Sequence, residues 1–270
     1  MAHRFYADTD ASSNEKDESS ISPLSSDGTS FESQTYYLSP EDTLHAQRVL
    51  RLREGAEIEL FANEKRYSAV ITGPSGNRLS VKTISPLPST EARLRITLYQ
   101  GLPKADKMEW IIQKAVELGV VRIVPVIMSR CVVKLESRDI PKKLERWRKI
   151  AREAGKQSGR CVIPEVANPL HLKQIPDSLS SLGISACAIP WEDSSAGGPL
   201  AFSQSHPDIS SLGLVIGPEG GISPEEISIL QPSCQPITLG PRILRTETAG
   251  LAAASAFLAL YGEMEMKMMD

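Results

Sequence analysis

Two glycine-rich stretches in the C-terminal half of the chain contain the residue types expected around a bound ligand. The first, "VIGPEGGISPEE" at residues 215–226, ends an apolar run with three glycines and carries a carboxylate at Glu219. The second, "LGPRILRTETAG" at residues 239–250, again places a glycine and a proline between a short apolar run and a helical pattern. Because glycine lets a backbone approach a ligand closely, the two loops predict opposite walls of one pocket.

The ligand of this pocket is not predicted to be a common nucleotide. The sequence contains neither GxxxxGKS/T nor GxGxxG, the motifs of nucleoside triphosphate and dinucleotide sites. Pro224 suits the first position of a helix capped by Ser223. The first glycine stretch therefore lies between a buried strand and a helix, where open α/β sheets bind ligands. The sequence indicates a small ligand of another kind.

The elements that position these loops alternate between strand and helix after residue 94. Apolar runs predict strands at 94–101, 121–127, 184–189 and 212–217, and helical periodicity predicts helices at 104–118, at 142–160 and from 224 onward. This order is typical of a parallel sheet covered by helices.

A smaller β domain is predicted before that sheet. Short alternating runs at 56–62, 66–73 and 78–84 are separated by turn residues. Ahead of them, Ser39 could cap a helix that displays His45, Arg48 and Arg51. The proline-rich stretch at 84–92 predicts a linker to the second domain.

Charge is distributed unevenly along the chain, whose net charge is −3. Residues 8–35 hold seven acidic side chains against one lysine and are rich in serine, a composition typical of disorder. Residues 142–160 hold eight basic and two acidic side chains. Lys104 and Lys107 lie at the start of a predicted helix, where cations are unfavourable without a nearby anion. These cations indicate phosphate contacts, with plain solvation as the alternative.

Composition also limits the class of protein. The chain has 41% hydrophobic residues, but no apolar run of membrane-spanning length and no apolar signal core. Its four cysteines are far apart and form no CxxC pair, so neither a disulfide framework nor a zinc site is indicated. We expect a soluble cytoplasmic protein with reduced, buried thiols.

The two glycine loops together resemble those of the ribosomal small-subunit uridine-N3 methyltransferases of the SPOUT superfamily. The resemblance extends to "RFYAD", "HAQRVLRLREG", "KADKMEWIIQKAVELGV", "SRCVV" and "REAGKQSGR", and so to nearly the whole chain outside the acidic segment. It implies a PUA-like β domain at 1–88, with a disordered acidic insertion at about 8–35, and an α/β methyltransferase domain at 89–270 with a C-terminal trefoil knot. It also implies a homodimer.

The resemblance implies that S-adenosylmethionine is held mainly by main-chain groups of both loops. The implied cofactor residues are Gly217, Gly220, Gly221, Leu239, Gly240, Ile243 and Leu244. The implied reaction moves the methyl group to N3 of a uridine in 16S rRNA of the small ribosomal subunit, and it requires no metal.

Uridine N3 carries a proton at neutral pH, so a proton acceptor and a stabilising cation are expected. Arg245 is the candidate cation, and Glu247 and Glu219 are candidate proton acceptors or organisers. Glu247 also suits a helix N-terminus. Because N3 lies on the Watson–Crick edge, the target must be unpaired or flipped out. The proposed RNA contacts are Arg4, His45, Arg48, Arg51, Lys104, Lys107, Arg130, Gln157 and Arg160.

Two other functions are compatible with parts of this pattern. A SPOUT enzyme acting on a ribose 2′-OH or on tRNA is disfavoured because the Asn…Arg signature is absent, and a non-catalytic PUA-type RNA-binding protein is disfavoured by the intact loops. The chain departs from the family pattern in the acidic insertion and at Lys156, where the family usually has Glu. The second departure predicts altered RNA contact.

Overall fold

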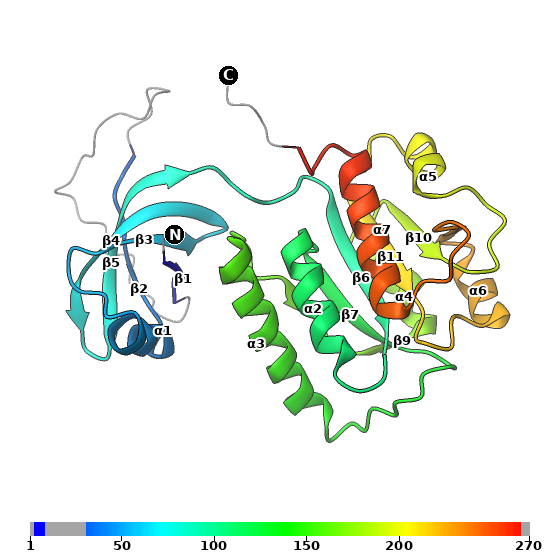
Figure 1. Ribbon diagram of the computed structural model, residues 1–270, viewed down its shortest axis with the longest axis horizontal. Helices are drawn as coiled ribbons and strands as arrows, with labels where there is room; N and C mark the ends of the chain where they lie inside the picture. Colours follow the sequence, from blue (N-terminus) through cyan, green and yellow to red (C-terminus); the bar gives the residue numbers. More distant parts are fainter. Residues whose placement is uncertain (1–2, 9–30, 266–270) are drawn as a thin grey trace. The chain divides into compact units, whose positions relative to one another are not determined.

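The computed structural model describes residues 3–8 and 31–265. Residues 9–30, the central part of the predicted acidic insertion, lie outside the described residues. The chain divides into two compact units, one ending at Glu91 but including residues 159–162, and the other formed by Ala92–Ser158 and Ile163 onward. Figure 1 labels most of their helices and strands.

The first unit is built on a five-stranded sheet with the strand order β1-β3-β4-β5-β2. Its strands are β1 (Arg4–Tyr6), β2 (Thr35–Tyr37), β3 (Glu57–Ala62), β4 (Lys65–Ser75) and β5 (Arg78–Leu87). β1 runs parallel to β3, and the other pairs are antiparallel. Phe5, Leu38, Leu60 and Val81 are buried in its core. The three predicted strands are confirmed, whereas β1 and β2, of three residues each, are too short for an alternating pattern to predict.

Two boundaries in this unit differ from the predicted ones. β5 continues to Leu87, with Pro86 opposite Tyr67, because β2 covers only Ser80–Lys82 and leaves this end of β5 as an edge that tolerates proline. Some described residues within the predicted insertion at 8–35 also belong to the folded part of this unit. Asp8 forms an ion pair with Arg78, and Ser33 is buried and donates a hydrogen bond to the Thr83 carbonyl.

The predicted helix after Ser39 is confirmed but ends early. Helix α1 (Pro40–Leu44) begins where the Ser39 hydroxyl accepts a hydrogen bond from the amide of Asp42 at 3.1 Å. A π-helical turn, η1 (His45–Val49), continues it. Arg51 lies beyond both, with a φ of 55°.

The second unit contains a seven-stranded sheet in which every strand pair is parallel. Its strand order is β12-β10-β11-β6-β7-β8, and β9 also pairs with β7. The strands are β6 (Arg95–Gly101), β7 (Arg122–Ile127), β8 (Glu165–Val166), β9 (Leu170–His171), β10 (Ala186–Pro190), β11 (Ser211–Ile216) and β12 (Gln235–Ile237). The predicted parallel sheet is confirmed.

Helices cover both faces of this sheet (Figure 1). They are α2 (Lys107–Leu118), α3 (Ile140–Ser158), the 3-10 turn η2 (Leu172–Gln174), α4 (Ile175–Ser181), α5 (Pro199–Ser205), α6 (Pro224–Leu230) and α7 (Thr246–Leu260). Alternation along β6 directs Leu98 into a core shared with α2, α3, α5 and α7, and Tyr99 into a second core shared with η2, α4 and α6. None of the helices in residues 3–8 and 31–265 is long and apolar enough to cross a membrane.

Two of the predicted helices have different ends. α2 begins at Lys107 rather than at 104, since Ala105 has a φ of 54° and residues 104–106 form a turn. α3 ends at Ser158, and the next residue is Gly159, which commonly terminates helices. α6 begins as predicted, with Ser223 as its cap.

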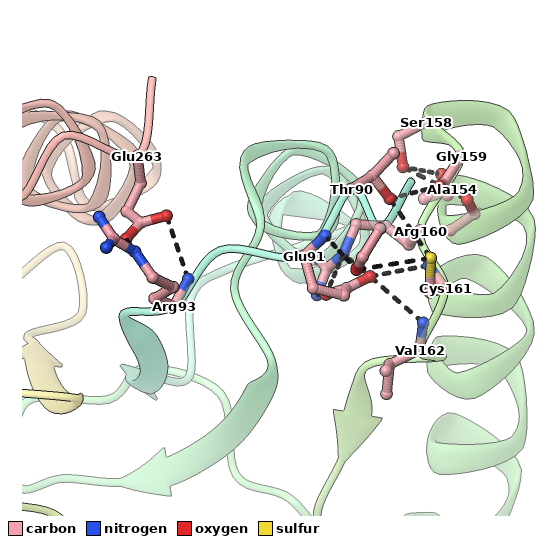
Figure 2. Close-up of polar contacts among 12 residues, drawn as sticks. Thr90, Glu91, Arg93, Ala154, Ser158, Gly159, Arg160, Cys161, Val162 and Glu263 are labelled. Carbon is pink, nitrogen blue, oxygen red and sulfur yellow. Dashed lines mark hydrogen bonds and ion pairs between the residues drawn. The ribbon is translucent and has the colours of Figure 1, made fainter. Parts of the chain in front are cut away.

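The segment that follows α3 belongs to the first unit and is fastened there by Glu91. The Glu91 carboxylate accepts hydrogen bonds from Arg160 Nη2 at 2.7 Å and from the amides of Cys161 and Val162 at 2.7 and 3.2 Å. Figure 2 shows these contacts, together with the hydrogen bond from Thr90 Oγ1 to the Gly159 carbonyl. The Tyr6 hydroxyl donates to the Arg160 carbonyl at 2.9 Å. The chain therefore passes between the two units three times.

We expect Glu91→Ala to lower the free energy of unfolding by about 3 kcal/mol, because removing one member of a buried ion pair leaves its partner's charge poorly compensated. The Arg160 side chain is 4% exposed. The matched control is Arg138→Ala, since the side chains of Arg138 and its partner Glu136 are 80% and 60% exposed. Its loss should be below about 1 kcal/mol. Urea unfolding measures both values, and equal losses would contradict the structural role of Glu91.

Candidate functional site

A cavity of about 810 Å³ lies in the second unit, beyond the carboxyl ends of β10, β11 and β12. Its lining comes from Lys107 and from three segments, at 190–194, 216–222 and 238–249, the last of which includes the start of α7. The structure therefore brings the two predicted glycine loops to one cavity. Its walls combine main chain, apolar side chains and a charged rim, which suits a small ligand with both apolar and polar parts.

Most of the predicted cofactor residues line this cavity. They are Gly217, Gly221, Leu239, Gly240, Ile243 and Leu244. Gly220 is not part of the lining, and its carbonyl accepts a hydrogen bond from Arg130 Nη1 at 2.9 Å. Ile243 lines the cavity at its open side and is 84% exposed.

Two glycines are required by the backbone of these loops. Gly221 and Gly240 have φ values of 70° and 96°, a region that residues with a Cβ rarely adopt. Gly221 is also crowded, since a Cβ there would lie 3.0 Å from Glu192 Oε1. The glycine content of both loops thus has a local structural cause.

The third wall, formed by Pro190, Trp191, Glu192 and Ser194, was not predicted. Pro190 ends β10 and the other three residues follow it, and β10 lies between β11 and β12 in the sheet. Their place beside the glycine loops follows from that strand order, which the sequence does not give. The sequence contains one signal of this wall, the apolar run at 184–189. A strand there would end at the same edge of the parallel sheet as the strands before the glycine loops.

A buried chain of hydrogen bonds fixes the two glycine loops relative to each other. Gln100 Nε2 donates to Thr246 Oγ1 at 2.9 Å, and Thr246 Oγ1 donates to the Gly217 carbonyl at 2.6 Å. The end of β6 also lies close to the first glycine loop, because a Cβ on Gly101 would lie 2.6 Å from the Pro218 nitrogen. The first residue of α7 is thereby held against the ends of β6 and β11. Gln100, Gly101 and Thr246 were not among the predicted site residues.

The charged rim centres on Lys107. Its Nζ lies 3.1 Å from Glu219 Oε1 and 3.2 Å from Glu247 Oε2. Glu247 lies in the first turn of α7 and outside the cavity lining. Arg245 is the residue before α7, is exposed and lines the cavity.

These contacts shift two pKa values. Hydrogen bonds to Glu219 and then to Glu247 raise the pKa of Lys107. Burial tends to raise the pKa of Glu219, but hydrogen bonds from its own amide, the Lys104 amide and Lys107 outweigh it and lower that pKa. Lys107 is therefore a cation and Glu219 an anion throughout the neutral range.

Several predicted RNA contacts have partners within the protein. Arg160 is 3% exposed and pairs with Glu91, so the structure does not support it as an RNA contact. Arg4 pairs with Glu59 at 3.0 Å. Lys107 was predicted to contact RNA, but in the structure it pairs with two carboxylates of the same chain. His45, Arg48, Arg51, Lys104, Arg130 and Gln157 are exposed.

Several basic side chains of helix α3 also have partners within the protein. Arg146 pairs with Glu109 at 2.7 Å, and Arg148 Nε donates to the Val166 carbonyl at 3.1 Å. Lys156, the departure from the family pattern, pairs with Glu153 at 3.2 Å and its side chain is 14% exposed.

Comparison with protein families and solved structures gives a consistent result. Residues 90–258 match the family model for the RNA methyltransferase domain, and residues 38–84 match the RNA methyltransferase PUA domain. The chain is 37% identical to ribosomal RNA small subunit methyltransferase E of Bacillus subtilis over 233 residues, which cover 83% of this chain and 90% of the relative.

Solved structures agree. The crystal structure of a ribosomal RNA small subunit methyltransferase E from Neisseria gonorrhoeae bound to S-adenosyl methionine has a TM-score of 0.75 and 31% identity, covering 98% of this chain and 100% of that one. A protein from Legionella pneumophila in complex with the cofactor SAM has a TM-score of 0.74 and 32% identity, covering 96% of this chain and 98% of that one.

We expect Thr246→Val to destabilise the protein by about 1 to 3 kcal/mol, because valine fills the same volume but removes the donor to the buried Gly217 carbonyl. Thr248→Val is the matched control, since Thr248 lies in the same helical turn and is exposed. Its effect should stay within about 0.5 kcal/mol. Thermal and urea unfolding provide the measurement, and indistinguishable variants would argue against the hydrogen-bond chain.

Proposed function

This chain belongs to the RNA methyltransferase family, and from that premise we propose that it methylates N3 of a uridine in 16S rRNA. Its cofactor is S-adenosylmethionine, and its substrate is the 16S rRNA of the small ribosomal subunit. The observation that carries the proposal is the cavity between two glycine loops inside the region that matches the family.

The residues present fit this cofactor. The cavity is large enough for a nucleoside joined to an amino acid, and much of its wall is main chain. A Cβ on Gly217 would lie 2.9 Å from the Gly221 carbonyl carbon, so only glycine lets the main chain of this loop close on itself. Gly217, Gly221, Leu239, Gly240 and Leu244 would hold the cofactor, with Ile243 at the open side. When bound, S-adenosylmethionine supplies a methyl group activated by its sulfonium.

Methylation of N3 requires residues of the chain to assist the loss of its proton. Arg245 lines the cavity and is exposed, and we assign to it the stabilisation of the negative charge that develops on the uracil oxygens. Glu219 and Glu247 are the two carboxylates at the same rim. They either accept the proton or organise the groups around it.

RNA binding involves the first unit as well as the second. Residues 38–84 match a PUA domain of RNA methyltransferases, and Arg48 and Arg51 are exposed in that region. His45, Lys104, Arg130 and Gln157 complete the exposed set. Because an N3 methyl acceptor cannot remain base-paired, these residues would hold RNA around an unpaired or flipped-out uridine.

We also propose the finer features implied by the family resemblance. The C-terminal segment forms a trefoil knot, in which α7 follows the loop that packs against the end of β11. The protein acts as a homodimer, and the exposure of the apolar Ile243 near the cavity supports a partner there. A substrate in the small ribosomal subunit implies a cytoplasmic location.

The function is tested by incubating the protein with radiolabelled S-adenosylmethionine and purified small ribosomal subunits lacking the modification. Nucleosides from the labelled rRNA are then identified by mass spectrometry. N3-methyluridine is expected. A 2′-O-methylated nucleoside or labelled tRNA would favour another SPOUT activity, and RNA binding without transfer would favour a non-catalytic RNA-binding protein.

We expect Gly240→Val to abolish S-adenosylmethionine binding in a folded protein, since a β-branched residue cannot adopt the φ of 96° without strain. A loss of at least about 100-fold in affinity is expected from displacement of one wall. Calorimetry measures it, with circular dichroism as the control for folding. Unchanged affinity in the folded variant would place the cofactor elsewhere.

Neutralising Arg48 and Arg51 together should weaken RNA binding without changing cofactor affinity. Each lost phosphate contact lowers the salt slope of log K by about 0.7 to 0.9, so the double variant should flatten it by roughly 1.5. Arg48→Gln and Arg51→Asn are suitable, because asparagine tolerates the left-handed backbone at position 51. Titration of the protein with rRNA fragments at several salt concentrations measures this slope. An unchanged slope would exclude both residues as phosphate contacts.

A further inference from the structure

Lys107 joins three elements that meet at the rim of the cavity. It is the first residue of α2, whereas Glu219 belongs to the loop after β11 and Glu247 to the first turn of α7. Its single ammonium lies within 3.2 Å of one oxygen of each carboxylate. Lys107 also lines the cavity, with its side chain 32% exposed. We call these three residues the Lys107 bridge.

The hydrogen bonds within the Lys107 bridge determine how strong a base Glu219 is. Glu219 Oε1 accepts from the Lys104 amide at 3.0 Å as well as from Lys107, and Oε2 accepts from the same amide at 3.3 Å. A carboxylate that already accepts several hydrogen bonds is a weak base. The lowered pKa of Glu219 agrees with that geometry. A general base works best when its pKa lies near the working pH, so Glu219 is poorly suited to take the N3 proton.

We propose that Lys107 is a positioning residue for methyl transfer, which holds Glu219 and Glu247 as an anion pair and leaves the N3 proton to water. This inference rests on the proposed function. The proton passes to a solvent hydroxide or water, and the freed N3 electron pair forms the new bond to the methyl carbon. The bond between methyl carbon and sulfur breaks, and its electron pair stays on sulfur.

The charges facing the bridge support this division of roles. Arg245 and Arg242 line the cavity on the side of α7, and Glu192 lines it on the side of β10. Without Lys107, Glu219 and Glu247 would face each other with no shared counter-ion. Like charges held close together repel each other, so the two carboxylates would move apart. Lys107 thus fixes α2, the first glycine loop and α7 together.

The test compares Lys107→Met, which removes the charge, with Lys107→Arg, which keeps it. The measurement is single-turnover methyl transfer to small ribosomal subunits at saturating cofactor and RNA. We expect Lys107→Met to slow the transfer step by about 10- to 100-fold, because misplaced reacting groups lose rates of this order. S-adenosylmethionine affinity should change less than about 3-fold, since the cradle is main chain. Lys107→Arg should retain most of the wild-type rate.

The pH dependence separates a positioning role of Lys107 from a role in proton transfer. If the N3 proton leaves to water, the wild-type rate should rise about tenfold per pH unit between about pH 6 and about pH 8. Lys107→Arg should keep this slope. Lys107→Met should keep the slope as well and lower the rate by the same factor at every pH, because the proton acceptor is unchanged.

Lys114→Met is the matched control, because Lys114 pairs with Glu117 on the same helix and does not line the cavity. It should behave as wild type. A flat wild-type profile would overturn the inference, since a carboxylate of low pKa would then be the base. So would a normal rate in Lys107→Met, or a loss of cofactor binding equal to the loss of rate. A wild-type protein that transfers no methyl group to uridine would instead refute the proposed function.

Discussion

The buried hydrogen bonds from Gln100 through Thr246 to the Gly217 carbonyl are the constraint on which the second unit depends. They join the end of β6, the start of α7 and the end of β11 at one point. A hydroxyl there both accepts and donates, and no apolar side chain could do so. Buried polar groups with unique partners specify one arrangement, so both glycine loops are held at a fixed separation. The cavity exists because that separation is maintained.

The sequence predicted the parallel sheet and the main strands of the β domain because their apolar periodicity extends over six or more residues, as in β3 and β6. It did not predict β1 and β2, which are three residues long. The glycine loops were recognisable because Gly221 and Gly240 require a backbone that few other residues adopt. The wall at 190–194 was not, since only the strand order places β10 between its neighbours.

Charged residues were the least predictable part of the site. Lys107 and Arg160 have the residue type of a phosphate ligand, and nothing in their local sequence distinguishes that role from an internal ion pair. Their partners, Glu219 and Glu247 for Lys107 and Glu91 for Arg160, are far away in sequence. Folding alone brings them together. A basic residue in an RNA-binding sequence therefore indicates RNA contact only when its side chain remains exposed, as with Arg48 and Arg51.

The position of residues 159–162 in the first unit has a consequence for synthesis of the protein on the ribosome. The strands of that unit are complete by Leu87, but the segment clasped by Glu91 is made about 70 residues later. At roughly 5 to 20 residues per second, translation supplies it several seconds after the sheet could form. During that interval Glu91 has neither Arg160 nor the amides of Cys161 and Val162 to bind. The N-terminal unit therefore cannot reach its final state as an independent, earlier-folding domain, and the two units must complete folding in an interleaved order.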